Sequence, residues 1–337
     1  MARTARVPDV DLATAGLLHD LFARAEEVDR VEAISEAFRL AVGPAREGVV
    51  HILRYAGDGT VVGYAQVAGA GTTAAGAATT AELVVDPSHR RQGHGRALLE
   101  AVLADGAHSV WAHGLLPAAE ALARSAGLVM TRSLYRMARP LTADDAVDPA
   151  LPAGFSVRAF EPGRDDETWV GLNAAAFASH PEQGRLTLED LHERMAQPWF
   201  DPAGLLLVED DETGRVVAFH WTKIEPTHAA TPRPRTGRAH GSGSSAARSG
   251  DGRAHGSGSS AARSGTGEVY VVGVHPAYQG RGLGAPLTRL GLAHLARRGL
   301  AAVELYVDGD NAAARRTYER LGFVDVAVDG QYTRAGT

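Results

Sequence analysis

One motif occurs twice in this chain, and this repetition constrains the fold more than any other feature. The first copy, ELVVDPSHRRQGHGRALL, spans residues 82–99, and the second, VVGVHPAYQGRGLGAPL, spans residues 271–287. In each copy an apolar run typical of a β-strand leads through a proline and a glycine-rich turn into a stretch typical of a helix. Two such copies predict two α/β domains of similar plan.

The glycine-rich turn of the second copy predicts a phosphate site. Gly280, Gly282 and Gly284 let the backbone turn tightly and point several N–H groups at one place, where a helix begins and its dipole favours an anion. The turn matches neither the dinucleotide fingerprint nor the P-loop. Its Q-x-x-G-x-G run resembles the loop with which GNAT N-acetyltransferases hold the diphosphate of acetyl-CoA. The alternative, a turn without a ligand, is disfavoured by the second copy.

The similarity between the two halves continues beyond the helix. Residues 302–323 predict a strand, a polar turn, a helix with Asn311 near its start and a stop at Gly322. The equivalent stretch of the first half is residues 109–128, where Ala123 stands at the position of Tyr318. If Tyr318 carries chemistry, only the second half is catalytic.

A chain of 337 residues is long enough for about two domains. We place the first at residues 1–140, a linker at 141–153 and the second at 154–337, with predicted helices over 12–41 and 165–196. The segment GRAHGSGSSAARSG occurs at 237–250 and again at 252–265. Because this composition cannot bury enough apolar surface, we predict a disordered insertion at about 228–266.

Composition excludes several classes of protein. The sequence has no cysteine, which excludes disulfides, thiolate metal sites and an acyl group carried on a protein thiol. A net charge of −6 gives no reason to expect nucleic acid. No apolar run approaches the roughly 20 residues of a membrane helix, and no secretory signal is recognisable. We therefore expect a cytoplasmic monomer without a metal, since the histidines show no ligand-like spacing.

Stretches along nearly the whole chain resemble the mycothiol synthase family, the tandem-GNAT N-acetyltransferases of actinobacteria. They are AELVVDP at 81, WAHG at 111, NAAAFASHPEQG at 173, WFDPAGL at 199, FHWTKI at 219, GEVYVVGVHP at 267 and LYVDGDNAAARRTYERLGF at 305. The resemblance implies an α/β (α+β) fold of two tandem GNAT domains, each a mixed, mostly antiparallel sheet flanked by helices, with a non-catalytic first domain. The repeat at 237–265 is extra to the family pattern.

The resemblance also implies a reaction. The family transfers acetyl from acetyl-CoA to the cysteinyl amine of desacetylmycothiol (Cys-GlcN-Ins). Because an α-amino group titrates at about 7.7 to 8.0, a base must accept its proton near neutral pH. We assign this role to Glu268, at the head of the strand before the glycine loop, and the general-acid role to Tyr318. The competing interpretations are a surface glutamate on an edge strand and an ordinary core tyrosine.

Further site residues follow from the resemblance alone. The acetyl-CoA contacts would be Val272, Gly273, Val274, Gln279, Gly280, Arg281, Gly282, Leu283, Gly284, Ala285, Asn311, Ala312, Ala313, Ala314, Arg315 and Arg316. A second acetyl-CoA would contact Leu83, Val84, Val85, Gly93 and Gly95. The acceptor would meet Glu36, Glu182, Lys223, Glu268 and Tyr306. Lys223 is the only lysine of the chain. For Glu36, Arg315 and Arg316 a solvated helix face is an open alternative.

Two other functions remain open from the sequence. One is a different GNAT N-acetyltransferase, acting on a protein N-terminus or an aminoglycoside. The other is a non-catalytic regulator that binds acyl-CoA.

Overall fold

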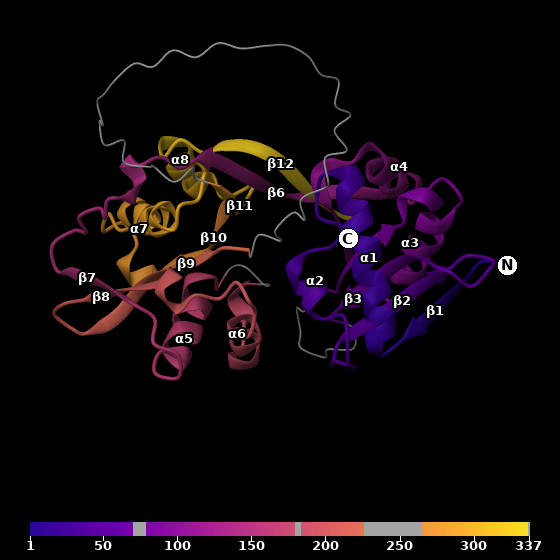
Figure 1. The fold of residues 1–337 in the computed structure, drawn as a ribbon, viewed down its shortest axis with the longest axis horizontal. Coiled ribbons are helices and arrows are strands. Elements are labelled where there is room, and N and C mark those ends of the chain that lie inside the picture. Colours follow the sequence, from indigo (N-terminus) through magenta and orange to yellow (C-terminus); the bar gives the residue numbers. More distant parts are fainter. Residues whose placement is uncertain (70–78, 179–182, 226–263, 336–337) are drawn as a thin grey trace, which may run out of the picture. The chain divides into compact units, whose positions relative to one another are not determined.

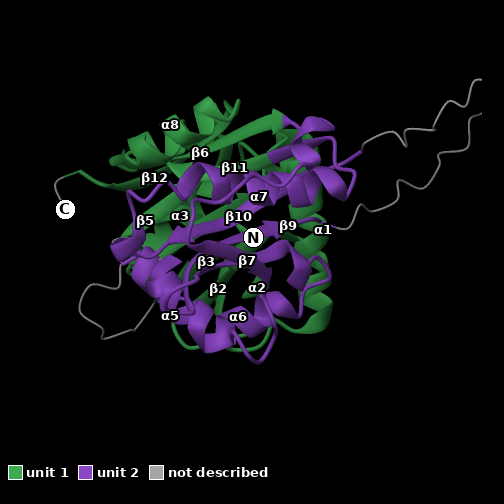
Figure 2. Ribbon diagram, turned by 90° about the vertical axis from the view of Figure 1, so that its left-hand side faces the viewer, with its two compact units in different colours: residues 1–139, 179–182, 304–337 green, residues 140–178, 183–303 purple. Residues whose placement is uncertain are grey.

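The computed structural model describes residues 1–69, 79–178, 183–225 and 264–335 (Figure 1). Their contacts divide the chain into two compact units (Figure 2). Unit 1 contains residues 1–139 and 304–337, and unit 2 contains residues 140–178 and 183–303. This division by contacts differs from the division into sequence repeats, whose boundaries remain a prediction. Residues 228–263 of the predicted insertion lie outside the described residues.

Unit 1 is built on a mixed sheet. Its elements are β1 (Arg3–Val7), α1 (Leu12–Asp29), α2 (Glu36–Leu40), β2 (Val49–Tyr55), β3 (Val61–Ala68), β4 (Thr80–Val85), α3 (His94–Ala104), β5 (Ser109–Ala112), α4 (Pro117–Ser125), β6 (Leu128–Pro140), most of β11 (Ala302–Asp308), α8 (Ala312–Arg320) and β12 (Val324–Arg334). The strand order is β1-β2-β3-β4-β5-β12-β6. β4 and β5 are parallel, whereas β12 is antiparallel to both β5 and β6.

The position of β12 is the unexpected feature of unit 1. β5 and β6 follow each other in the chain, yet β12 lies between them and pairs with both. Tyr332 lies opposite Val110 on β5, and Val328 lies opposite Tyr135 on β6. The last strand of the second half therefore completes the sheet of the first half.

Alternation along the strands of unit 1 produces two apolar layers. Ile52 on β2 packs in one cluster with Leu98 and Val102 of α3. Its neighbour Leu53 packs in another cluster with Leu21 and Phe22 of α1. The helices thus cover both faces of the sheet, as the sequence predicts for this fold class.

Unit 2 repeats this plan with an antiparallel sheet. Its elements are β7 (Phe155–Ala159), α5 (Asp166–Ala176), α6 (Leu188–Met195), β8 (Leu205–Asp210), β9 (Arg215–Lys223), β10 (Thr266–Val274) and α7 (Gly284–Arg297). The strand order is β10-β9-β8-β7. Trp169 of α5 packs edge-on against Trp221 of β9, with ring centroids 5.2 Å apart. Leu287 of α7 packs in a separate cluster with Val208 and Val217.

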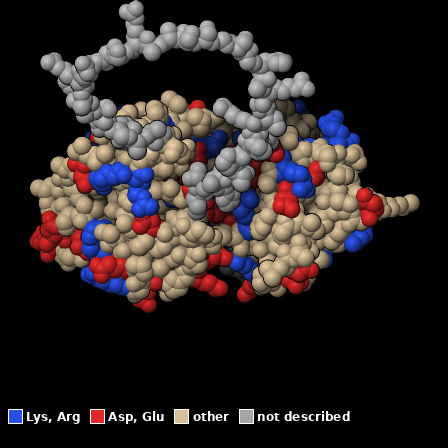
Figure 3. Space-filling view, viewed as in Figure 1, with Lys and Arg blue, Asp and Glu red and all other residues tan. Residues whose placement is uncertain are grey.

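Charged side chains of both signs stand side by side on the surface of each unit (Figure 3). Many of them form exposed ion pairs, such as Arg6 with Asp105 and Arg164 with Glu161. Exposed pairs of this kind contribute at most about 1 kcal/mol each. The buried apolar clusters therefore stabilise the two units.

Candidate functional site

The glycine loop of unit 2 forms an open cradle at the start of a helix. β10 ends at Val274, and the Gln279 side chain donates a hydrogen bond from Nε2 to the Val274 carbonyl oxygen over 3.3 Å. Gly280 and Gly282 have φ angles of 77° and 80°. These values lie in the left-handed region, which glycine adopts without steric cost. Glycine at both positions therefore lets the chain form this turn without strain.

The first turn of α7 has no side-chain cap. The N-cap residue Leu283 has no side-chain hydrogen bond, and a Cβ added at Gly280 or Gly284 would meet no described atom within 4 Å. Unsatisfied N–H groups and the helix dipole together favour an anion here. This geometry is suited to a diphosphate.

The first copy of the motif has the same backbone path. Arg91 and Gly93 have φ angles of 62° and 83° and stand where Gly280 and Gly282 stand in the second copy. Arg90 donates from Nε to the carbonyl oxygen of Val85 over 3.2 Å, as Gln279 does to Val274. The repeat predicted from the sequence is thus matched by a repeated conformation.

The two loops differ in how they are fixed. Both terminal nitrogens of Arg90 bind the carboxylate of Asp29 on α1, at 2.7 and 2.6 Å. The first copy therefore ties its loop to the helix packed beside it.

Two predicted acceptor residues lie next to each other in unit 2. Glu268 on β10 is directly opposite Lys223 on β9, and paired residues of an antiparallel ladder point to the same face. This is the face of Trp221, which α5 covers. A register shift between Val269 and Val271 marks a β-bulge just after Glu268.

Lys223 is held in a largely buried environment that includes aromatic rings and the carboxylate of Glu225. Its side chain is 9% exposed, and Nζ lies 2.7 Å from Glu225. Nζ also lies 5.1 Å from the ring centroid of Trp199 and 5.6 Å from that of Tyr270, distances at which a cation is attracted to an aromatic face. The only lysine of the chain thus lies opposite Glu268 in the sheet.

Helix α8 carries the predicted acid, and this helix belongs to unit 1. Tyr318 packs edge-on against Phe323, with ring centroids 5.8 Å apart. Burial raises the pKa of Tyr318 to about 12. Its hydroxyl has no hydrogen-bond partner among the residues that the structure describes. The phenol therefore remains protonated throughout the physiological range.

The other predicted residues of α8 also have roles within the fold. Oδ1 of Asn311 caps the helix by accepting from the Ala314 backbone N–H over 3.1 Å. The Arg315 guanidinium binds Asp325 at 2.8 Å and lies 3.8 Å from the ring centroid of Tyr135. Arg316 is exposed. Contacts of residues 311–316 with acetyl-CoA remain a prediction.

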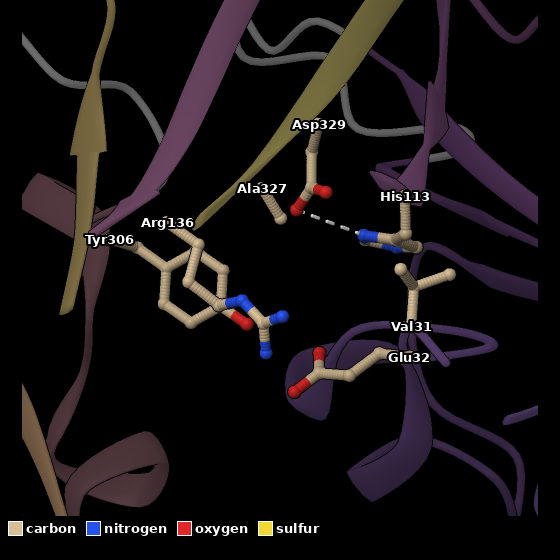
Figure 4. A pocket seen from close by; sticks show the side chains of 7 residues that line it. All are labelled: Val31, Glu32, His113, Arg136, Tyr306, Ala327 and Asp329. Carbon is tan, nitrogen blue, oxygen red and sulfur yellow. Dashed lines mark hydrogen bonds and ion pairs between the residues drawn. The ribbon is translucent and has the colours of Figure 1, made fainter. Parts of the chain in front are cut away.

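The remaining predicted acceptor residues are distributed over other elements. Glu36 is the first residue of α2 and is half-buried. Tyr306 lies on β11 and lines a small pocket within unit 1 (Figure 4). Glu182 lies outside the described residues.

A buried ionic cluster in unit 1 was missed from the sequence. His113 lies between two carboxylates, with Nε2 3.2 Å from Glu82 and Nδ1 3.2 Å from Asp329 (Figure 4 draws the Asp329 contact). Asp329 also accepts from the Gly114 backbone N–H at 2.8 Å, and Glu82 accepts from that of Ser35 at 2.6 Å. His113 belongs to the WAHG motif, but its partner on β12 is 216 residues away, so spacing gave no signal.

The surroundings of His113 favour the imidazolium form of its ring. Burial lowers its pKa, but the charge of Glu82 and the hydrogen bonds of Asp329 and Glu82 outweigh burial, so that the pKa is raised well above 6.5. Both ring nitrogens face carboxylates, and only the doubly protonated ring can donate to both. Ion pairs of this cluster therefore connect β4, the segment after β5, and β12.

Replacing His113 with glutamine should lower the free energy of unfolding by about 3 kcal/mol, because two buried carboxylates lose their shared cation. Denaturant unfolding at pH 6.5 measures this loss. The exposed His108→Gln variant is the control and should stay within about 0.5 kcal/mol of wild type. A loss below 1 kcal/mol in His113→Gln would contradict the role of the ion pair.

The contribution of the Glu82, His113 and Asp329 cluster to the free energy of unfolding should depend on pH. Because the pKa of His113 is raised in the folded state, its contribution is complete below the unfolded value of 6.5 and is lost as pH rises through the folded pKa. The difference in unfolding free energy between wild type and His113→Gln should therefore shrink above neutral pH. His108→Gln should keep the pH dependence of the wild type.

The described ranges contain neither a membrane-spanning helix nor a group of side chains arranged as a metal site. No helix there is long and apolar enough to cross a membrane. No group of three or more His, Cys, Asp or Glu side chains in residues 1–69, 79–178, 183–225 and 264–335 is arranged to hold a metal ion.

The fold and the glycine loop define an acetyltransferase of the GNAT class. The profile of the acetyltransferase (GNAT) family matches residues 172–323, and that of a GNAT acetyltransferase domain matches residues 46–136. The mycothiol acetyltransferase of Streptomyces coelicolor is 46% identical over 93% of this chain and 89% of the relative. That of Parafrankia sp. is 44% identical over 96% of both chains. The chain belongs to the mycothiol acetyltransferase family.

Solved structures share the tandem fold. A GCN5-related N-acetyltransferase from Sphaerobacter thermophilus has a TM-score of 0.59 at 22% identity, with 98% of this chain and 94% of that chain covered. A tandem GNAT protein from the clavulanic acid biosynthesis pathway has a TM-score of 0.62 at 19% identity, with 99% and 98% covered. At these identities the likeness concerns the fold alone. The predicted fold class and family are confirmed.

Proposed function

We propose that the protein transfers the acetyl group of acetyl-CoA to the cysteinyl amine of desacetylmycothiol. The observation that carries this proposal is the similarity to mycothiol acetyltransferases, at 46% identity over 93% of the chain. The open cradle at the start of α7 supports the cofactor part, because it offers N–H donors and a helix dipole to a diphosphate.

Acetyl-CoA would supply an activated thioester. Residues 279–285 would surround its diphosphate through backbone N–H groups, and residues 272–274 would contact the pantetheine arm. Arg281 adds a cation, and its guanidinium lies 4.4 Å from the ring centroid of Tyr278 at the edge of the loop. Asn311 through Arg316 would complete the cofactor contacts.

The chemistry then needs one proton acceptor and one donor. Glu268 would accept the proton of the attacking amine, directly or through water. Tyr318 would donate to the departing thiolate. A full transfer from a phenol of pKa about 12 to a thiol-like group of pKa about 8.5 is uphill. Tyr318 would therefore act chiefly through a hydrogen bond that strengthens as the thiolate develops.

The acceptor carries an amine and many hydroxyls. Carboxylates and a few donors are suited to such a molecule, and we assign Glu36, Glu182, Lys223, Glu268 and Tyr306 to it. The pairing of Lys223 with Glu268 across β9 and β10 supports two of these assignments.

We infer that unit 1 binds a second acetyl-CoA through its own copy of the loop. Leu83, Val84, Val85, Gly93 and Gly95 would contact it, and the matching φ angles of Arg91 and Gly93 support this inference. Without a tyrosine at position 123 this molecule would not react. Calorimetric titration should find two acetyl-CoA per chain, and a value of one would refute the second site.

A turnover assay tests the proposed function. Purified protein is mixed with acetyl-CoA and Cys-GlcN-Ins, and the loss of thioester and the gain of acetylated product are followed by mass spectrometry. Because the acceptor itself contains a thiol, a thiol reagent would not report CoA alone. Peptides and aminoglycosides are assayed in parallel. Turnover of only these acceptors would favour another N-acetyltransferase, and acetyl-CoA binding without any turnover would favour a regulator.

A further inference from the structure

One face of the sheet in unit 1 is polar where β11, β6 and β12 run side by side. Ala327 on β12 lies opposite Arg136 on β6, so both point to this face. Alternation puts Arg132 on the same face of β6, and ion pairs place Glu304 and Asp308 of β11 beside the two arginines. Charged groups on a partly buried sheet face are stabilised by partners, either within the protein or from a ligand.

Arg132 and Arg136 of β6 differ in how many of their guanidinium N–H groups have a hydrogen-bond partner. Arg132 binds Asp308 with two hydrogen bonds, at 2.7 and 2.6 Å. Arg136 has one long contact, 3.4 Å from Nη1 to Glu304, although its side chain is only 27% exposed. Its other N–H groups have no partner among the described residues. An arginine left with unpaired donors in a partly buried position indicates a binding group.

The donors of Arg136 point into a pocket. The guanidinium lies beside the hydroxyl of Tyr306, and the carboxylate of Glu32 faces both of them (Figure 4). Asp329 and His113 form the opposite wall. The space between them accommodates a group the size of one water molecule, and therefore a single hydroxyl.

Charge decides which class of ligand this pocket accepts. Glu32, Glu82, Glu304 and Asp329 outnumber the two cations Arg136 and His113, so that an anion would be repelled. A hydroxyl avoids this repulsion, since it accepts from a guanidinium and donates to a carboxylate at the same time. The pocket is therefore suited to a neutral polyhydroxyl ring that inserts one hydroxyl.

We propose that Arg136 and Glu32 are specificity-determining residues that bind a hydroxyl of the acceptor's sugar and cyclitol part. This proposal rests on the proposed function for the identity of the acceptor. His113 acts as a positioning residue, because its ion pair fixes the Asp329 wall of the pocket.

Binding of N-acetylglucosaminyl inositol to the full chain tests the pocket without turnover. This probe has the polyol and the amide of the acceptor but no reactive amine. Isothermal titration calorimetry should show that Arg136→Gln binds it at least about tenfold more weakly than wild type, since the hydroxyl loses its charged donor. Arg136→Lys, which keeps a charge but not the planar fork, should recover part of the affinity.

Arg132→Gln is the matched control on the same strand and face. This substitution should lower the thermal midpoint because the ion pair with Asp308 is lost. Its affinity for N-acetylglucosaminyl inositol should equal that of the wild type. Equal affinity of wild type and Arg136→Gln, equal losses in both glutamine variants, or no binding to wild type would overturn the proposal. A protein that binds the probe and fails to acetylate Cys-GlcN-Ins would refute the proposed function and leave the pocket standing.

Discussion

Replacing Glu268 with glutamine should lower kcat by about two to four orders of magnitude, the usual contribution of a positioned general base. Glutamine keeps the shape and the position opposite Lys223 but cannot accept the proton of the amine. Because the proposed acetyl-CoA contacts are residues 272–274, 279–285 and 311–316, and not Glu268, the affinity for acetyl-CoA should stay within about twofold of wild type. Steady-state kinetics and calorimetry measure both quantities.

Glu209→Gln is the control for this experiment. Glu209 lies on β8 in the same unit and binds Arg158, outside the proposed site. Its replacement should leave kcat near the wild-type value. A Glu268→Gln enzyme that retains half of the wild-type kcat would remove Glu268 from the reaction.

Replacing Tyr318 with phenylalanine should lower kcat by about a hundredfold, near the lower end for acid catalysis. The expected loss is at this end because burial raises the pKa of Tyr318 to about 12, which makes complete proton transfer unfavourable. The ring contact with Phe323 is kept, so the thermal midpoint should not change. Steady-state kinetics with Cys-GlcN-Ins and a thermal melt test both expectations.

Tyr55→Phe is the matched control for the loss of a phenol hydroxyl. Tyr55 lies on β2, where Arg3 covers its ring at 3.9 Å, outside the proposed catalytic residues. If Tyr318→Phe and Tyr55→Phe have the same kcat, Tyr318 has no part in the reaction.

The sequence predicted those parts of the fold that depend on local pattern. The two copies of the strand, glycine turn and helix fold alike. Arg91 and Gly93 in the first copy have φ angles similar to those of Gly280 and Gly282 in the second. The helical stretches 12–41 and 165–196 contain α1, α2, α5 and α6. Such features depend on residues that are close together in the sequence, so the sequence alone can predict them.

Long-range pairing could not be predicted in this way. Nothing in the residues of β12 indicates that Gly330 will pair with Ala112 of β5. Strand partners are selected by packing over the whole sheet, whereas local pattern reports only that a strand exists. The Glu82, His113 and Asp329 cluster depends on that pairing and was therefore missed with it. The roles of Glu268 and Tyr318 came from family resemblance and remain to be measured.

The place of β12 has a consequence for synthesis of the protein. The amino-terminal half emerges from the ribosome long before residues 324–334 are made. These residues form β12, the strand that lies between β5 and β6 in the sheet of that half. During that interval the edges of β5 and β6 have unpaired backbone groups, and closing so large a loop is slow. The sheet of the nascent first half therefore lacks this strand until residues 324–334 have been synthesised.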